Sequence, residues 1–390
     1  MKIGKQARVM LAATLLLAGC KNFFNVSSTT TTCTTNCATT SSGVFYVLNS
    51  NSGQVGIAGF SIVSGKLTAI TGSPFTVASS PYAIAVAPNN SFLYVSTSTG
   101  IYLYTIGSGG ALTVASKTPI STDFSAYTMQ VDATDSWLVE ASGGGYLYAI
   151  PVNPTNGTTT GTPQQVALAG FSAHQLVISP DNTNVFVTLG GTGTAVIPFA
   201  AASTDPLPKS VGAPIAVKVP GGVAVSVAVD PKNQLLYIGE TSVTSAATNT
   251  GGLRAFLYSS LSGTPIEIPG SPYASGGLTP ASILPIATGA YVYVANSTVS
   301  NSSTGNVSGF AITPSGTTYA LTALSSTAAG GTTPEDLAED STGSVVLLVN
   351  SGGNPDLEAF SFDTTSPGKL DSVLTSSTGT DPVGAIAVAP

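Results

Sequence analysis

The chain has 390 residues, of which 7% are charged and 43% are hydrophobic, and its formal net charge is −7. With only 11 Lys and Arg residues it cannot neutralise many phosphates, which excludes nucleic acid as a partner. The hydrophobic content is too high for a disordered chain. Glu, Lys and Arg, which favour helices, are scarce, whereas Gly, Pro and β-branched residues are abundant. The composition therefore predicts a large all-β protein with an uncharged polar surface.

Residues 1–19 are typical of a secretory signal peptide. Basic residues precede an apolar stretch over residues 9–17, which is too short to cross a hydrocarbon core of ~30 Å as a helix. The stretch ends in Leu17-Ala18-Gly19-Cys20, which resembles the bacterial lipobox. This resemblance implies cleavage before Cys20 and lipidation of its thiol, so that acyl chains hold the protein at a membrane. The alternative is an ordinary secretory signal in which the Cys is incidental.

Residues 20–42 begin with the lipidated Cys and continue as a Thr-rich stretch of low complexity, which we expect to act as a flexible tether. Lys21 stands where an inner-membrane retention signal usually carries Asp. The sequence therefore favours the outer membrane of the cell envelope, with the protein facing the periplasm or the cell surface. In that oxidising compartment Cys33 and Cys37 are able to close a small local disulfide.

Residues 43–390 contain a unit of roughly 50 residues that repeats along the chain. Each unit starts with an alternating strand, a short turn and an apolar second strand such as the Phe-Leu-Tyr-Val run of residues 92–95. The period fits the four short strands of a β-propeller blade. The first turns of the units align at Pro88, Ala133, Pro180, Pro231, Ala287, Ser341 and Pro390.

The two ends of this region predict how the ring closes. The chain ends after the first strand of a unit, and the region begins at residue 43 with the second strand of one. Two partial units therefore combine into a seventh blade, in which the N- and C-terminal strands pair. Tandem β-sandwiches are the alternative, but they would not predict a split unit. The sequence thus predicts an all-β, seven-bladed β-propeller over residues 43–390.

The repeats resemble the seven-bladed lactonase-like propellers, a family that includes 6-phosphogluconolactonases and carboxymuconate cyclases. The resemblance covers residues 43–390 and includes the motifs Gly72-Ser73-Pro74-Phe75 and Gly270-Ser271-Pro272-Tyr273. It is specific for the fold and much less so for activity, because propellers of unrelated function share such repeats.

The resemblance implies a catalytic pair of His174 and Glu240. His174 opens an inner strand before Pro180-Asp181, and Glu240 ends a second strand, as in the family. An acid–base pair of this kind would activate water against a lactone carbonyl. The family's Arg after a strand-ending Asn is absent here, because Asn296 is followed by Ser297. A phosphosugar or carboxylate ligand would need such a cationic fork, so we consider the catalytic site incomplete.

A propeller places two rings of residues on one face, because neighbouring strands of a blade are antiparallel. One ring starts the innermost strands and faces the mouth of the channel, and its members are Tyr82, Tyr127, His174, Val225, Ala281, Glu335 and Gly384. The other ends the second strands, and its members are Asn49, Thr97, Ser142, Leu189, Glu240, Asn296 and Asn350.

Three of these residues are candidate ligand-binding groups. Tyr82 and Tyr127 are able to stack on a sugar, and Asn296 is able to donate or accept hydrogen bonds. The competing interpretation is structural: Tyr is a routine strand residue, and Asn296 is a turn former that tolerates positive φ.

Residues 335–340 contain the densest cluster of acidic side chains. On a regular strand Glu335 and Glu339 share one face, and Asp336 and Asp340 share the other. Carboxylates facing the channel are hard ligands suited to Ca²⁺ or Mg²⁺, which makes Glu335 and Glu339 candidate metal ligands. A solvated acidic face is the alternative, and we expect no other cofactor.

Two functions remain open. The first is a lipid-anchored envelope module that binds a small molecule or a protein at one propeller face, with an eroded lactonase site. The second is a lactone hydrolase that uses His174 and Glu240. The missing Arg and the single His favour the binding module.

Overall fold

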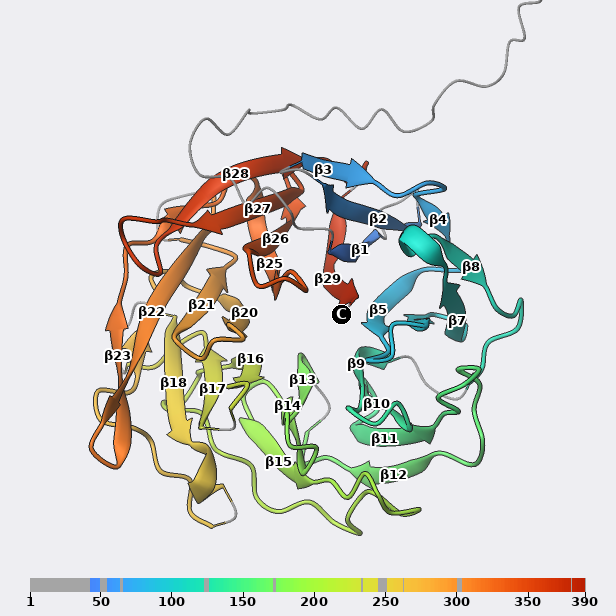
Figure 1. Cartoon of the computed structure of the whole chain (residues 1–390). Helices are drawn as coiled ribbons and strands as arrows, with labels where there is room; N and C mark the ends of the chain where they lie inside the picture. Colours follow the sequence, from blue (N-terminus) through green and yellow to red (C-terminus); the bar gives the residue numbers. More distant parts are fainter. Residues whose placement is uncertain are drawn as a thin grey trace, which may run out of the picture.

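The computed structural model describes residues 43–49, 55–63, 66–122, 126–170, 173–232, 234–244, 251–261, 263–299, 304–379 and 381–389. Cys20, Cys33, Cys37 and the rest of the predicted signal and tether lie outside this set. The described strands form seven sheets arranged as blades around a central channel, as the sequence predicts (Figure 1). None of the described helices has the length and apolar character needed to span a membrane.

Blades are numbered here along the chain, and each is an antiparallel sheet whose first strand faces the channel. Blade 1 contains β29 (Pro382–Ala389), β1 (Val44–Asn49), β2 (Gly56–Val63), β3 (Lys66–Ala69) and β4 (Phe75–Thr76). Blade 2 contains β5 (Pro81–Val86), β6 (Phe92–Thr97), β7 (Gly100–Ile106) and β8 (Leu112–Val114), with the 3₁₀ turn η1 (Ser108–Gly110). Blade 3 contains β9 (Ala126–Val131), β10 (Trp137–Ser142), β11 (Tyr146–Pro151) and β12 (Gln164–Ala167).

The remaining blades vary in the number of strands. Blade 4 contains β13 (Leu176–Ile178), β14 (Asn184–Thr188) and β15 (Thr194–Pro198). Blade 5 contains β16 (Ala224–Val229), β17 (Leu235–Glu240), β18 (Gly252–Leu257) and β19 (Tyr273–Ala274), with η2 (Tyr258–Ser260). Blade 6 contains β20 (Pro280–Pro285), β21 (Tyr291–Asn296), β22 (Asn306–Ser315), β23 (Thr318–Ala323) and β24 (Thr327–Ala328). Blade 7 contains β25 (Thr332–Glu339), β26 (Val345–Gly352), β27 (Leu357–Phe362) and β28 (Leu370–Ser376).

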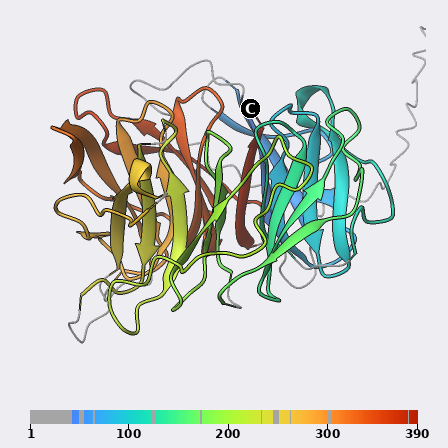
Figure 2. The same ribbon diagram turned by 90° about the horizontal axis from the view of Figure 1, so that it is seen from below.

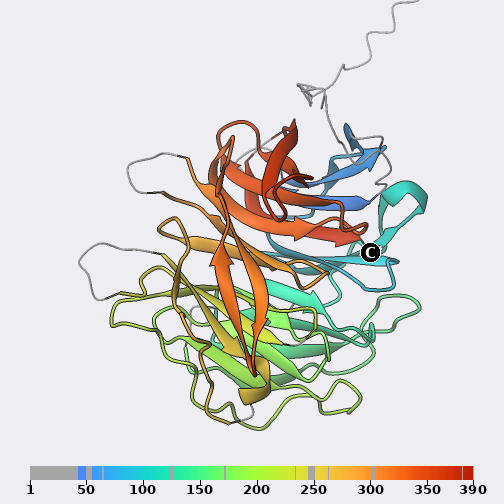
Figure 3. The same cartoon turned by 60° about the vertical axis from the view of Figure 1, so that its left-hand side comes forward.

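The ring closes in blade 1 as predicted. Strand β29, from the end of the chain, pairs antiparallel with β1, from the start of the propeller, so that Phe45 lies opposite Val388. In the side view the strands run between the two faces of the ring, and loops cover both faces (Figure 2). The long hairpin of β22 and β23 lies on the outside of blade 6 (Figure 3).

Each second strand is apolar on both sides because it packs against two blades. In β6, Leu93 and Val95 face a core shared with blade 1, whereas Phe92 and Tyr94 face a core shared with blade 3. Consecutive residues of a strand point to opposite faces, so both faces must be apolar to be buried. This explains the continuous apolar runs in the repeats.

Tyrosines on second strands also join neighbouring blades through their hydroxyl groups. Three of these hydroxyls donate to the carbonyl of a glycine with positive φ in an outer turn of the next blade, whereas the hydroxyl of Tyr237 in β17 has no partner among the described residues. The pairs are Tyr46 with Gly110 (2.7 Å), Tyr94 with Gly157 (3.0 Å) and Tyr293 with Gly368 (2.7 Å). These bonds satisfy a buried hydroxyl that apolar packing alone would leave unpaired.

Candidate functional site

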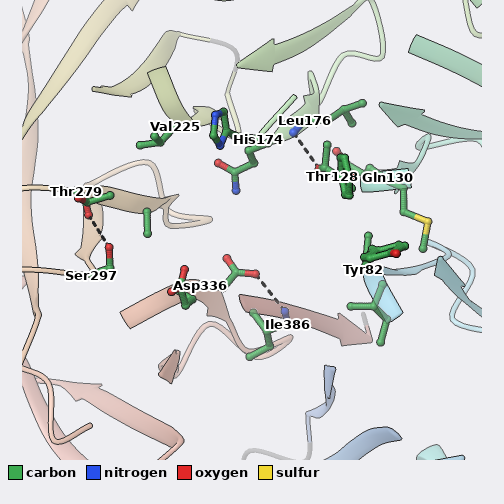
Figure 4. Close-up of a pocket in the computed structure, with 17 residues that line it drawn as sticks. Tyr82, Thr128, Gln130, His174, Leu176, Val225, Thr279, Ser297, Asp336 and Ile386 are labelled. Atoms are coloured by element: carbon green, nitrogen blue, oxygen red, sulfur yellow. Dashed lines mark hydrogen bonds between the residues drawn. The ribbon is translucent and has the colours of Figure 1, made fainter. Parts of the chain in front are cut away.

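A cavity of about 580 Å³ lies in the central channel, with walls made by the innermost strands of the blades (Figure 4). Its polar lining includes hydroxyl, amide, imidazole and carboxyl groups. The lining includes Tyr82, Ala83, Tyr127, Thr128, Met129, Gln130, His174, Gln175, Glu335 and Asp336.

A β-bulge in the innermost strands determines which side chains reach this cavity. In blade 2 the register shifts between Pro81 and Ala83, and corresponding shifts occur in blades 3, 5, 6 and 7. A bulge adds one residue and re-aims its side chain. The residues at these shifts are Tyr82, Tyr127, Val225, Ala281 and Glu335, and all of them line the cavity together with His174. The ring predicted from the sequence therefore faces the channel at these positions.

His174 lies at the entry to blade 4, where its backbone N–H donates to the carbonyl of Thr188 at 3.0 Å. Its imidazole lies on one side of the cavity and Asp336 lies on the other (Figure 4). Burial lowers the pKa of His174, so the ring is neutral at neutral pH. A neutral imidazole is able to accept a proton from water or from a ligand hydroxyl.

Side chains of one blade accept hydrogen bonds from backbone N–H groups on the innermost strand of the next blade. Thr128 Oγ1 accepts the N–H of Leu176 at 3.0 Å, and Gln130 Oε1 accepts the N–H of Ile178 at 2.8 Å. Innermost strands lack a neighbour on the channel side, so their N–H groups need such acceptors. The polar residues of the wall are therefore held in fixed positions.

Asp336 joins three blades at the point where the ring closes. Its carboxylate accepts the hydroxyl of Ser282 in blade 6 at 2.9 Å and the N–H of Ile386 in β29 at 3.1 Å. Burial raises the pKa of Asp336 to about 7, although these hydrogen bonds oppose the rise. Asp336 therefore lines the cavity and also binds the last strand, β29, to the rest of the ring.

The prediction that Glu335 and Asp336 lie on opposite faces of their strand is wrong. Because Glu335 sits in the bulge, Glu335 and Asp336 both line the cavity. Glu335 accepts the hydroxyl of Ser351 at 2.9 Å, and burial raises its pKa. Glu339 lies outside the cavity lining and accepts the N–H of Ala287 at 2.6 Å. Among the residues that the structure describes, no group of three or more His, Cys, Asp or Glu side chains is placed to hold a metal ion.

The structure does not bring Glu240 to His174 in the cavity. Glu240 is 1% exposed and lies outside the lining, where its Oε1 accepts Nη1 of Arg254 at 2.7 Å. Its Oε2 accepts the backbone N–H of Lys218 at 2.8 Å. Arg254 also donates from Nε to Glu267 at 2.9 Å. The carboxylate of Glu240 therefore forms a buried ion pair that joins β17 to β18.

The three candidate ligand residues have different surroundings. Tyr82 and Tyr127 meet edge to face with ring centroids 5.5 Å apart, and Tyr127 is 50% exposed at the cavity. Asn296 is fully buried in β21, outside the lining, and its amide donates to Ser275 O at 2.7 Å and Asn306 Oδ1 at 2.8 Å. It is not among the described non-glycine residues with positive φ, so its interpretation as a left-handed turn residue is wrong.

Sequence reasoning missed Gln130, Gln175 and Asp336 as cavity residues. Each stands shortly after a residue that was predicted to face the mouth of the channel, and this position is the signal that the sequence offers for them. In blades 3 and 7, which hold Gln130 and Asp336, a bulge interrupts the alternation of the innermost strand, and strict alternation along the sequence does not predict it. No Lys or Arg contributes to the cavity lining among the described residues.

The fold and the central cavity define a seven-bladed propeller with a polar channel site. The model of the family described as "Lactonase, 7-bladed beta-propeller" matches residues 36–386, and the chain belongs to this family. No curated protein matches the chain.

Solved structures share the fold at low sequence identity. The chain is similar to a candidate 6-phosphogluconolactonase of Bacteroides fragilis, with a TM-score of 0.69, 17% identity and coverage of 91% of this chain and 100% of that one. It is also similar to the periplasmic gluconolactonase of Pseudomonas aeruginosa, with a TM-score of 0.65, 16% identity and coverage of 90% and 99%. A protein of Lactobacillus plantarum gives a TM-score of 0.66, 20% identity and coverage of 90% and 100%.

Proposed function

We propose that this protein is an envelope binding protein whose channel cavity takes a small, uncharged, polyhydroxylated molecule. The observation that carries the proposal is the composition of the cavity wall, which combines carboxyl, amide and Tyr side chains without a Lys or Arg among its described residues. Such a wall accepts and donates hydrogen bonds to hydroxyl groups, and the exposed ring of Tyr127 offers an apolar face to a sugar ring.

The same wall disfavours anionic ligands. A phosphate or carboxylate near Glu335 and Asp336 would find no cationic partner among the described lining residues, and the ionised fraction of these two carboxyl groups would repel it. This electrostatic argument distinguishes the proposal from a site for phosphorylated sugars, the substrate class after which the similar Bacteroides fragilis protein is named.

Calorimetric titration of the purified protein with D-glucono-1,5-lactone, D-glucose and D-glucose 6-phosphate tests the proposal. We expect binding of at least one neutral compound, at least tenfold weaker binding of the phosphate, and loss of affinity in Tyr127→Ala. Lys209→Ala, an exposed substitution away from the cavity, is the matched control. Preferential binding of the phosphate would reject the proposal.

Lactone hydrolysis is a second candidate because His174 lines the same cavity as Glu335 and Asp336. In this reaction His174 takes a proton from water while the oxygen adds to the lactone carbonyl carbon. The ring C–O bond then breaks, the departing oxygen takes the proton back from His174, and the product is a hydroxy acid. Family membership and the similarity to a periplasmic gluconolactonase support this candidate.

Titration of the acid released from D-glucono-1,5-lactone measures this activity above the spontaneous rate. A hydrolase should lose about 10²-fold or more in turnover in His174→Ala. Glu240→Gln should retain turnover if the buried ion pair has only a structural role. Loss of turnover in a folded Glu240→Gln protein would restore the pair of His174 and Glu240.

We also propose that Cys20 carries a lipid that holds the propeller at the outer membrane. The lipobox-like Leu17-Ala18-Gly19-Cys20 supports this proposal. Growth with a labelled fatty acid should label the wild type and leave Cys20→Ser unlabelled. Equal labelling of both proteins, or of neither, would contradict it.

A further inference from the structure

The interface between blades 2 and 3 contains polar atoms that no described protein group satisfies. They are both carboxyl oxygens of Glu140, Oγ of Ser96 and Oγ of Ser121. Glu140 and Ser96 are each 0% exposed. Burying a polar group without a hydrogen bond costs on the order of 1–3 kcal/mol, so three such side chains in one interface require an explanation.

Strand register shows that the two hydroxyl groups face blade 3. Ser96 lies opposite Ala83 on one side and Ile101 on the other, and Ser121 bridges to Ile101. Directly opposed residues of antiparallel strands point to the same face of a sheet. Ala83 and Ile101 belong to the apolar core shared by blades 2 and 3, so Ser96 and Ser121 face that core as well.

Glu140 faces the same core from the other side. It lies opposite Met129, and it stands two residues after Leu138 on β10. Met129 and Leu138 both belong to the core that contains Ala83 and Ile101. The unpartnered atoms of the two blades are therefore directed into one interface.

This polar spot lies between two cavities. Ala83 and Met129, the register partners of Ser96 and Glu140, line the central cavity. On the other side, Ser121 lines a smaller cavity of about 210 Å³ between residues 119–122 and residues 159–163. The buried polar atoms therefore have a cavity that is able to admit solvent on either side: the central cavity beside Ala83 and Met129, and the smaller cavity beside Ser121.

We propose that Glu140, Ser96 and Ser121 form an internal water-binding site between blades 2 and 3. A carboxyl and two hydroxyl groups supply both donors and acceptors, and a buried water commonly needs two to four such partners. A metal ion is a poorer fit, because one carboxylate with two hydroxyls leaves most of the ligand sphere of a hard cation unfilled. This inference does not depend on the proposed ligand of the channel.

Oxygen-17 relaxation dispersion of water, measured on the full chain, tests the site because it detects water molecules with long residence times. We expect Glu140→Leu to lower the dispersion amplitude relative to the wild type, and Ser96→Ala to lower it as well. Glu140→Gln keeps the polar end of the side chain and should retain the wild-type amplitude. A high-resolution crystal structure should place ordered water within hydrogen-bonding distance of Glu140 and of Ser96 or Ser121.

Several outcomes would overturn the proposal. One is an unchanged amplitude in both Glu140→Leu and Ser96→Ala, with the variants folded by circular dichroism. Another is a crystal structure in which the interface is dry or Glu140 bonds directly to a protein group. A sodium or calcium ion at the site, recognised by short oxygen distances, would also reject water as the ligand. If Glu140→Leu does not fold, the Ser96→Ala result decides.

Discussion

Nη1 of Arg254 donates a 2.7 Å hydrogen bond to Oε1 of Glu240, and the two side chains are 7% and 1% exposed. Glu267 completes the arrangement by accepting Nε of Arg254, and Cζ of Arg254 lies 4.8 Å from the ring centroid of Phe256. The side chain of the single arginine of the propeller is therefore held by contacts within blade 5. It lines the wall of a second cavity, away from the channel.

Breaking this ion pair should destabilise the protein. Arg254→Met leaves Glu240 buried without its cation, and we expect a loss of about 3–5 kcal/mol in the free energy of unfolding. Urea denaturation followed by circular dichroism measures the change. Lys209→Met removes a cation from an exposed pair with Asp205, and it should cost at most about 0.5 kcal/mol. Equal losses in the two variants would contradict the structural role of Arg254.

The tyrosine hydroxyls offer a matched comparison. Tyr94→Phe removes a donor from the carbonyl of Gly157 in the next blade, so we expect a loss of about 1 kcal/mol. Tyr237 is equally buried, but its hydroxyl has no partner among the described residues. Tyr237→Phe should therefore be neutral or stabilising by thermal denaturation. A greater loss for Tyr237→Phe than for Tyr94→Phe would refute this account of the blade contacts.

Glu140 should make stability fall as the pH rises. Burial raises its pKa from 4.5 to about 8, so the folded state holds the proton more tightly than the unfolded state. Its contribution is fully present below about pH 4.5 and is lost progressively up to about pH 8. At about 1.4 kcal/mol per pKa unit, the total amounts to a few kcal/mol.

Glu140→Gln isolates this effect because the amide does not titrate. The variant should unfold at the same urea concentration as the wild type near pH 5 and at a higher one near pH 9. Parallel stability curves for the two proteins between these pH values would show that Glu140 ionises normally in the folded state.

Asp336→Ala should loosen the strand that closes the ring. The substitution leaves the N–H of Ile386 and the hydroxyl of Ser282 without this acceptor, and we expect a loss of about 2–3 kcal/mol. Hydrogen exchange should accelerate more in residues 382–389 than in β6, which lies in a blade formed by one continuous segment. Asp336→Asn keeps one acceptor oxygen and should have a smaller effect. Uniform acceleration across all blades would argue against a local role.

The sequence predicted the architecture because the information is local and repeated. Turn residues such as Pro88 and Pro180 recur at a regular interval, and the runs between them are apolar on both faces. Only a sheet covered on both sides buries such runs. The split unit at the two ends predicted that the terminal strands pair, and β1 and β29 do pair, with Phe45 opposite Val388.

The candidate site was predicted less completely because it depends on strand bulges and on contacts between side chains of different strands. His174, Tyr82, Tyr127 and Glu335 were found from their place in the repeat, and the structure directs them to the cavity. Glu240 occupies the predicted strand end, but the repeat does not show that its side chain meets Arg254 from the neighbouring strand.

The sequence alone therefore determined the class of fold, the number of blades and the way the ring closes, because strand period and turn chemistry are local properties. The tertiary structure decided which polar groups face the channel. A bulge turns Glu335 and Asp336 to the same side, and burial pairs the only arginine of the propeller with Glu240. The low charge of the chain follows from blades covered on both faces, whereas the absence of Lys and Arg from the described cavity wall follows from where folding places the few cations.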